Sequence, residues 1–175
     1  STPFFPKSID LLHGKVTLYL WVTEGLGLRM TCILYKDYRI YSHMKTYESL
    51  DGITIRVGTN AKENYELTES SHTANWWLHV KGWPGSHVVV SYDGDFLPKE
   101  TKKDAAALAV HYSQASGQKQ VIVDLIRVQY VHPLNTHGSV ELSKDPIEVL
   151  VFIKREKPRL DRLEKVVSSV HINPK

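Results

Sequence analysis

"WWLHVKGWPGSHVVV", residues 76–90, has the pattern of two β-strands joined by a tight turn. Aromatic and β-branched residues fill both ends, and glycine and proline interrupt the centre. Side chains alternate between the two faces of a strand, so one face of 76–80 is expected to be core. The other face then carries an aromatic ring, an imidazole and an ammonium group. The expected core set is Trp76, Leu78 and Val80, and the opposite set is Trp77, His79 and Lys81.

The turn between these strands suggests a binding site. Residues 83–86 fit a type II turn, with Pro84 fixing φ and Gly85 supplying a positive φ. Gly82 and Gly85 leave backbone N–H groups uncovered, as an anion-binding nest requires. A hydroxyl and an imidazole follow, from Ser86 and His87. We expect the side chains of four residues to be at least partly solvent-accessible around one concave surface: His79, Lys81, Ser86 and His87. Together these groups are the parts needed to hold an unstacked nucleotide and its phosphate.

A purely structural interpretation competes with this hypothesis. A tryptophan pair in a strand more often belongs to a core than to a base-stacking platform. A Pro-Gly pair between strands is first of all a turn, and His79 and His87 are also compatible with half-buried, hydrogen-bonded histidines. Composition alone favours the structural interpretation.

The rest of the chain predicts a single α+β domain with a mostly antiparallel sheet. β-Rich runs occupy 15–22, 28–35, 53–57, 76–80, 86–92, 120–125, 127–131 and 147–153. Helices are predicted over 60–71, 101–116 and 158–170. The expected caps are Asn60 with Glu63 and Thr101 with Asp104, with Gly117 closing the second helix. Pro158 suits the first turn of the last helix, in which Leu160, Leu163, Val167 and Val170 form one apolar stripe.

Composition limits the class of protein. The chain has 175 residues, 42% of them apolar and 23% charged, which fits one folded domain. The single cysteine, Cys32, excludes an internal disulfide and a cysteine metal cluster. No apolar run approaches the ~20 residues of a membrane-spanning helix, and the start lacks a secretory pattern. Residues 154–175 carry seven Lys/Arg against three acidic residues, a net charge of +4, whereas the rest of the chain sums to −1. Such a tail is more often a solvated helix face than a phosphate-binding element.

Four segments resemble the NFACT-R domain family. They are "GITIRVGTNAKENYELT" (52–68), "NWWLHVKGWPGSHVVV" (75–90), "AAALAVHYSQAS" (105–116) and "VIVDLIRVQYVHP" (121–133), and the resemblance extends over roughly 52–165. It implies an RNA-binding domain, found fused to ribosome quality-control factors that engage tRNA on large ribosomal subunits or as a small free-standing protein. Asn60 and Asn64 match the first motif of the family, and His79, Gly82, Pro84, Gly85, Ser86 and His87 match the second. The remaining RNA-binding candidates are Trp77, Lys81, Tyr130 and His132.

The chain departs from the family where cations are usual. Thr59 precedes the first asparagine, Ser91 follows the second motif, and "VQYVHPLNTHG" (128–138) replaces a lysine-rich segment. Each change removes a partner for phosphate. The predicted organisation is an N-terminal β-hairpin extension (1–50), an NFACT-R-like domain (51–157) and a basic C-terminal helix (158–175).

Other chemistries have weaker support. A zinc site would need His79 and His87 with His111, His132 or His137, but no familiar ligand spacing is present. Ser86-His87 lacks a nucleophile elbow, so neither an enzyme, nor a metal, nor a cofactor is predicted. We expect a non-catalytic module that acts on or near ribosomal RNA or tRNA, with ribosomal or other ribonucleoprotein partners and no membrane. The alternative is a structural component of a ribonucleoprotein whose RNA contacts have degenerated. A cytoplasmic location is expected, with mitochondrion or plastid left open.

Overall fold

The computed structural model describes residues 9–12, 15–24, 27–35 and 44–169, with side chains over 44–165. The chain divides into two units, 1–43 and 44–175. The first unit holds β1 (Ile9–Leu12), β2 (Lys15–Glu24) and β3 (Gly27–Tyr35). These strands form an antiparallel sheet in the order β1-β2-β3. The hairpin predicted from 15–22 and 28–35 is therefore present, and β1 adds a strand that the sequence did not indicate.

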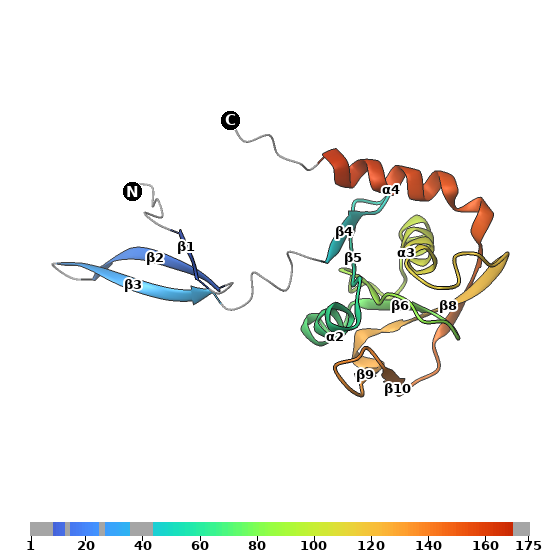
Figure 1. Ribbon diagram of the computed structural model, residues 1–175, viewed down its shortest axis with the longest axis horizontal. Helices are drawn as coiled ribbons and strands as arrows, with labels where there is room; N and C mark the ends of the chain where they lie inside the picture. Colours follow the sequence, from blue (N-terminus) through green and yellow to red (C-terminus); the bar gives the residue numbers. More distant parts are fainter. Residues whose placement is uncertain (1–8, 13–14, 25–26, 36–43, 170–175) are drawn as a thin grey trace. The chain divides into compact units, whose positions relative to one another are not determined.

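The second unit is built on a six-stranded antiparallel sheet, so the predicted α+β class is confirmed (Figure 1). Its order is β11-β8-β6-β7-β5-β4. The strands are β4 (Lys45–Glu48), β5 (Thr54–Val57), β6 (Trp76–Val80), β7 (Val88–Val90), β8 (Gln120–Arg127) and β11 (Ile147–Phe152). A separate two-stranded sheet pairs β9 (Val131–Pro133) with β10 (Val140–Leu142). Because β4 is an edge strand of the main sheet, residues 45–48 belong to this sheet and not to the N-terminal strands.

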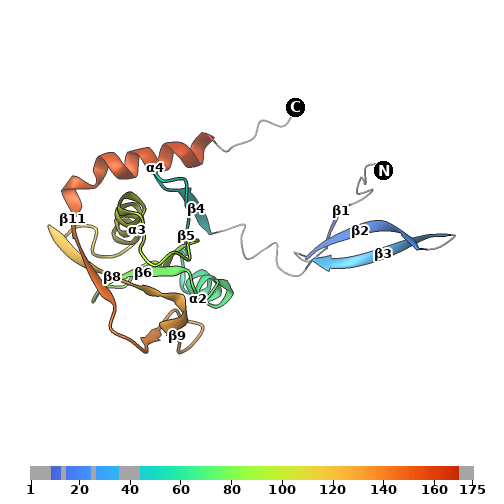
Figure 2. The same cartoon turned by 180° about the vertical axis from the view of Figure 1, so that it is seen from behind.

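Helices cover both faces of the sheet, as the two opposite views show (Figures 1 and 2). Helix α3 (Lys99–His111) packs on one face, and α4 (Lys157–Ser169) lies across α3 and β4. Helix α2 (Ala61–Ser70) lies on the other face beside β9. Two short 3₁₀ helices, η1 (Val128–Tyr130) and η2 (Ile153–Arg155), complete the elements. No helix in these described ranges is both long and apolar enough to span a membrane.

The core lies between the sheet and α3. Trp76, Leu78 and Val80 are buried there, as strand alternation predicted. The facing surface of α3 contributes the small buried side chains of Ala105, Ala106 and Ala109 to this core. Leu163 of α4 is also fully buried, whereas the side chains of Val167 and Val170 lie outside the described residues.

Helix α3 corrects two predicted boundaries. Thr101 does not cap the helix, which begins at Lys99 after Pro98. Thr101 lies in the first turn, where its backbone N–H and hydroxyl donate to the Asp51 carboxylate at 2.9 and 2.7 Å. A residue fifty positions away thus supplies the acceptor expected from a local cap. Nor does Gly117 close the helix, which ends at His111.

One predicted strand is also wrong. Residues 128–130, expected to belong to a strand over 127–131, form η1 instead. The backbone N–H of Val128 donates to Asn75, and that of Gln129 donates to Thr73, each at 2.9 Å. Because these backbone groups bond to the 73–75 loop, residues 128–130 do not continue strand β8. The β-rich composition of this segment does not reveal such a tertiary contact.

The carboxylate of Asp104 anchors α4 to α3. Asp104 is fully buried and accepts from Arg159 at 2.6 Å and Arg162 at 2.5 Å, and from the Leu50 backbone N–H at 2.9 Å. It was predicted as the capping partner of Thr101, and its observed role is this anchor. The two arginines come from the first half of α4, so one side chain fixes the helix position.

Asp104→Ala is expected to lower the free energy of unfolding by about 2 kcal/mol, because it removes a buried acceptor shared by two guanidinium groups and one backbone N–H. Denaturant titration monitored by circular dichroism measures the loss. Asp161→Ala is the matched control, since it breaks only the exposed Lys157–Asp161 pair and is expected to cost no more than about 0.5 kcal/mol. Equal losses in the two variants would contradict the anchoring role.

Candidate functional site

A groove of about 650 Å³ opens where four segments meet: the start of α2, the 84–86 turn, the residues after α3, and the 137–139 loop. We call it the polar groove. Its lining residues are Thr59, Asn60, Ala61, Asn64, His79, Pro84, Gly85, Ser86, Tyr112, Ser113, Gln114, His137, Gly138 and Ser139. The two motif segments, 59–64 and 79–86, therefore converge on one surface although they are distant in sequence.

The start of α2 forms one wall of the groove. The Asn60 side chain accepts from the backbone N–H of Glu63 at 3.0 Å, which confirms the predicted N-cap. The Glu63 carboxylate accepts from the backbone N–H and hydroxyl of Thr59, at 2.7 and 2.6 Å. The return bond of the capping box therefore goes one residue earlier than expected. A carboxylate thus lies immediately behind this wall.

Asn64 joins α2 to the turn segment. It is buried, and its amide donates to the Gly85 carbonyl at 3.3 Å and accepts from the His87 backbone N–H at 2.9 Å. Both ends of the amide are thereby occupied by backbone groups. The second motif asparagine holds the groove together, with little hydrogen-bonding capacity left for a ligand.

The 82–86 turn differs from the predicted nest. Positive φ occurs at Gly82 (74°) but not at Gly85, so the expected type II turn is wrong. Gly85 is required for a different reason: a Cβ there would lie 2.7 Å from the Cβ of Ser113, with which it forms a β-bridge. The Ser86 N–H already donates to the Tyr112 carbonyl at 3.1 Å. This amide is not available to an anion.

Three rings pack beneath the groove. The ring centroid of Trp77 lies 5.7 Å from that of His79 and 5.1 Å from that of His87. The centroids of the two imidazoles are 5.6 Å apart. Only His79 lines the groove, because Trp77 and His87 are each 2% exposed. The expectation that His87 and Ser86 are solvent-accessible is therefore wrong, whereas His79 is partly exposed as predicted. Helix α2 and the loop before β10 cover this face, which a strand pattern does not reveal.

His87 is held in its neutral form. Burial, followed by the nearby His79, lowers the pKa of His87 to about 4. Its Nε2 lies 3.1 Å from the Gly138 carbonyl and its Nδ1 2.8 Å from the Thr68 hydroxyl. A carbonyl only accepts, so Nε2 carries the proton and Nδ1 faces the Thr68 hydroxyl as an acceptor. Burial also lowers the pKa of His79, so both imidazoles are uncharged at pH 7.

The other predicted site residues lie outside the groove. Lys81 is partly exposed as predicted, but it is paired with Glu148, and Gly82 is exposed nearby. Tyr130 lies under the ammonium group of Lys144, 5.1 Å from the ring centroid. His132 contacts the Ser143 hydroxyl at 3.0 Å. Across the described ranges, no three His, Cys, Asp or Glu side chains are grouped to hold a metal ion.

Sequence reasoning missed the wall that follows α3. Ser113 pairs with Gly85, the Gln114 backbone N–H donates to the Pro84 carbonyl at 2.9 Å, and Tyr112 contacts Tyr47 through their hydroxyls. Lys45 lies 5.1 Å from the Tyr112 ring centroid, so one cation stands near this wall. The polar run "YSQ" (112–114) was the signal in the sequence that could have revealed this wall. It follows the alanine-rich segment, where the helix was expected to continue.

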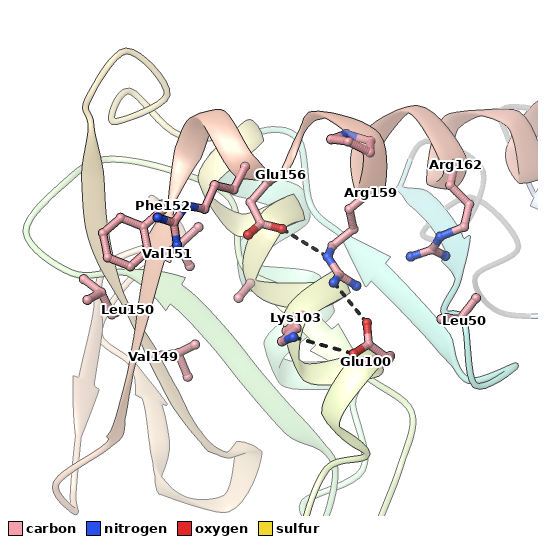
Figure 3. Close-up of a pocket in the computed structure, with 13 residues that line it drawn as sticks. Leu50, Glu100, Lys103, Val149, Leu150, Val151, Phe152, Glu156, Arg159 and Arg162 are labelled. Carbon is pink, nitrogen blue, oxygen red and sulfur yellow. Dashed lines mark hydrogen bonds and ion pairs between the residues drawn. The ribbon is translucent and has the colours of Figure 1, made fainter.

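A second hollow, of about 580 Å³, lies between β11, α3 and α4 (Figure 3). Its cations are largely engaged within the protein. Arg159 pairs with Glu100 and Glu156, each at 3.0 Å, and Arg155 stacks on Phe152 at 4.6 Å. We call it the helix–strand hollow. It contains none of the motif residues.

Comparison with known proteins identifies the family to which this chain belongs. The family model for the NFACT protein RNA binding domain matches residues 41–141, more than half of the chain. The chain therefore belongs to the NFACT RNA-binding domain family. The match begins earlier than the resemblance seen in the sequence, and it ends before β11 and α4.

Relatives from bacteria extend this result. Rqc2 homolog RqcH from Streptococcus suis is 34% identical over 138 residues, which is 75% of this chain and 25% of that protein. Rqc2 homolog RqcH from Bacillus subtilis is 38% identical over 94 residues, 53% of this chain and 16% of that protein. The solved C-terminal part of the fibronectin/fibrinogen-binding protein from S. suis matches with a TM-score of 0.61 and 31% identity, covering 70% of this chain and 48% of that one. The chain thus spans a quarter or less of these two curated relatives.

Proposed function

We propose that this protein is a non-catalytic RNA-binding module that acts on ribosomal RNA or tRNA, in ribosome quality control or assembly, with ribosomal particles as its partners. One observation supports this most strongly: the two motif segments of an RNA-binding family line the same groove. The groove offers hydroxyls, amides and the neutral imidazole of His79, groups that recognise RNA by shape and base edges.

RNA affinity is expected to fall steeply with salt. Each single-strand phosphate neutralised by a cation contributes a slope of about −0.7 to the dependence of log affinity on log salt concentration. Exposed cations outside the groove, such as Lys154 and Lys165, can supply these contacts. Fluorescence anisotropy with a tRNA or rRNA fragment between ~50 and ~200 mM salt measures the slope. Affinity that is flat over this range would count against the proposal.

The second candidate is a structural role in a ribonucleoprotein without RNA binding of its own. It is favoured by the neutral lining of the groove and by the histidines that stand where the family has lysines. Co-sedimentation with ribosomal particles before and after nuclease separates the two. RNA binding by the isolated protein supports the first candidate, and nuclease-resistant association without it supports the second.

A further inference from the structure

The lining of the polar groove has no carboxylate, ammonium or guanidinium group. None of its fourteen described residues is Lys, Arg, Asp or Glu. The Glu63 carboxylate behind Thr59 adds negative potential at the wall formed by α2. The amide of Ser86, which an anion would need, is engaged with Tyr112. The groove is therefore poorly suited to a phosphate, which requires cations or free backbone amides.

Several polar side chains of the groove have no partner within the described residues. The Ser86 hydroxyl, the Gln114 amide and the Ser139 hydroxyl make no hydrogen bond to another described group. Ser86 as a whole residue is only 5% exposed, and it lines the groove. A side-chain amide presents a donor and an acceptor side by side, the arrangement that matches the edge of a base.

The walls of the groove provide ring surfaces beside these polar groups. Half-buried His79 and the partly exposed Tyr112 both line it. Hydroxyl contacts of Tyr112 with Tyr47, and with Glu164 of α4 at 3.5 Å, fix the position of its ring. Flat side chains next to unpaired amide and hydroxyl groups suit a planar, uncharged heterocycle with hydrogen-bonding edges.

We infer that the polar groove receives an unstacked nucleobase of the RNA strand, while the phosphates are held by cations outside it. This inference rests on the proposed function and specifies what that site binds. It separates two contributions to RNA binding. The base in the groove contributes affinity that is insensitive to salt, and the cations contribute the salt-dependent share.

The test compares a labelled single-stranded RNA oligonucleotide with one of equal length whose bases are replaced by abasic sites. Wild-type protein is expected to bind the intact strand at least about tenfold more tightly than the abasic strand, at every salt concentration. The double variant Gln114→Ala/Ser139→Ala is expected to bind the intact strand about tenfold more weakly than wild type, with an unchanged salt slope. Its affinity for the abasic strand should equal that of wild type.

Gln118→Ala is the matched control, because Gln118 is an exposed glutamine outside the groove. It is expected to bind both strands as wild type does. The inference is overturned if wild type binds both strands equally, if the double variant binds the intact strand normally, or if it flattens the salt slope. Complete absence of RNA binding by wild type would instead remove the proposed function itself, so the two failures are distinguishable.

Discussion

Trp77→Ala is expected to lower the free energy of unfolding by about 3–5 kcal/mol, the range for removing a buried tryptophan. Trp77 is 2% exposed and packs against both imidazoles on the α2 side of the sheet. Its removal leaves a cavity between the sheet and the polar groove. The neighbouring backbone is tied by Asn64 to α2, so the site has little freedom to collapse around the void.

Urea titration at neutral pH measures this loss, and Trp83→Ala supplies a matched control. Trp83 belongs to the same stretch but is 38% exposed, so its removal is expected to change stability by less than about 0.5 kcal/mol. Trp77→Phe is expected to fall between the two, since the buried indole N–H that it removes makes no hydrogen bond to any described group. A loss from Trp77→Ala no larger than from Trp83→Ala would show that the ring cluster does not support the fold.

Strand alternation predicted one face of β6 well and the other poorly. The core face followed from local spacing alone, because Trp76, Leu78 and Val80 meet a helix that is apolar on the matching side. The state of the opposite face depends on α2, which precedes β6 in the chain, and on the loop before β10, where Gly138 contacts His87 across 51 positions. Local sequence does not encode that coverage. For this reason Trp77 and His87 seemed available for binding but are buried.

Distant side chains likewise decided the details that local rules missed. The Asp51 carboxylate takes the place of a local cap at the start of α3. Ser113 lies so close to residue 85 that only glycine fits there. The turn rule for Pro-Gly assumed a positive φ, whereas close approach of two backbones is what excludes a side chain there. Where the partner was local, as at the Asn60 N-cap, the prediction was confirmed, although the Glu63 carboxylate accepts from Thr59 and not from Asn60.

The motif residues of this family have two kinds of role in the structure. Asn64, Gly85 and His87 make internal contacts that hold α2, the turn and the 138 loop together. Asn60 and His79 line the groove and keep exposed surface. The motif residues of the family therefore specify the shape of the groove as well as the side chains that are exposed to a ligand. The competing structural and binding interpretations of the 76–90 stretch therefore apply to different residues within it.

Folding stability is expected to fall by about 3 kcal/mol through His87 as the pH is lowered from neutral to 4. The pKa of His87 is about 4 in the folded protein, against 6.5 for an ordinary histidine. Between these values the unfolded chain binds a proton that the folded protein does not, so acid favours unfolding. The stabilising contribution is complete above about pH 6.5 and is lost as the pH falls toward 4. His79, whose pKa is also lowered, acts in the same direction.

Urea titrations of wild type and His87→Gln at pH 7, 6 and 5 isolate this contribution, because the carboxylates titrate alike in both proteins. Glutamine keeps one donor and one acceptor for Gly138 and Thr68 but has no titratable group. The variant is expected to be less stable than wild type at pH 7, and the difference should shrink by about 2 kcal/mol at pH 5. His132→Gln, at an exposed histidine outside the groove, should retain the wild-type pH dependence. If His87→Gln and wild type lose stability in parallel, the buried imidazole is not what makes this fold acid-sensitive.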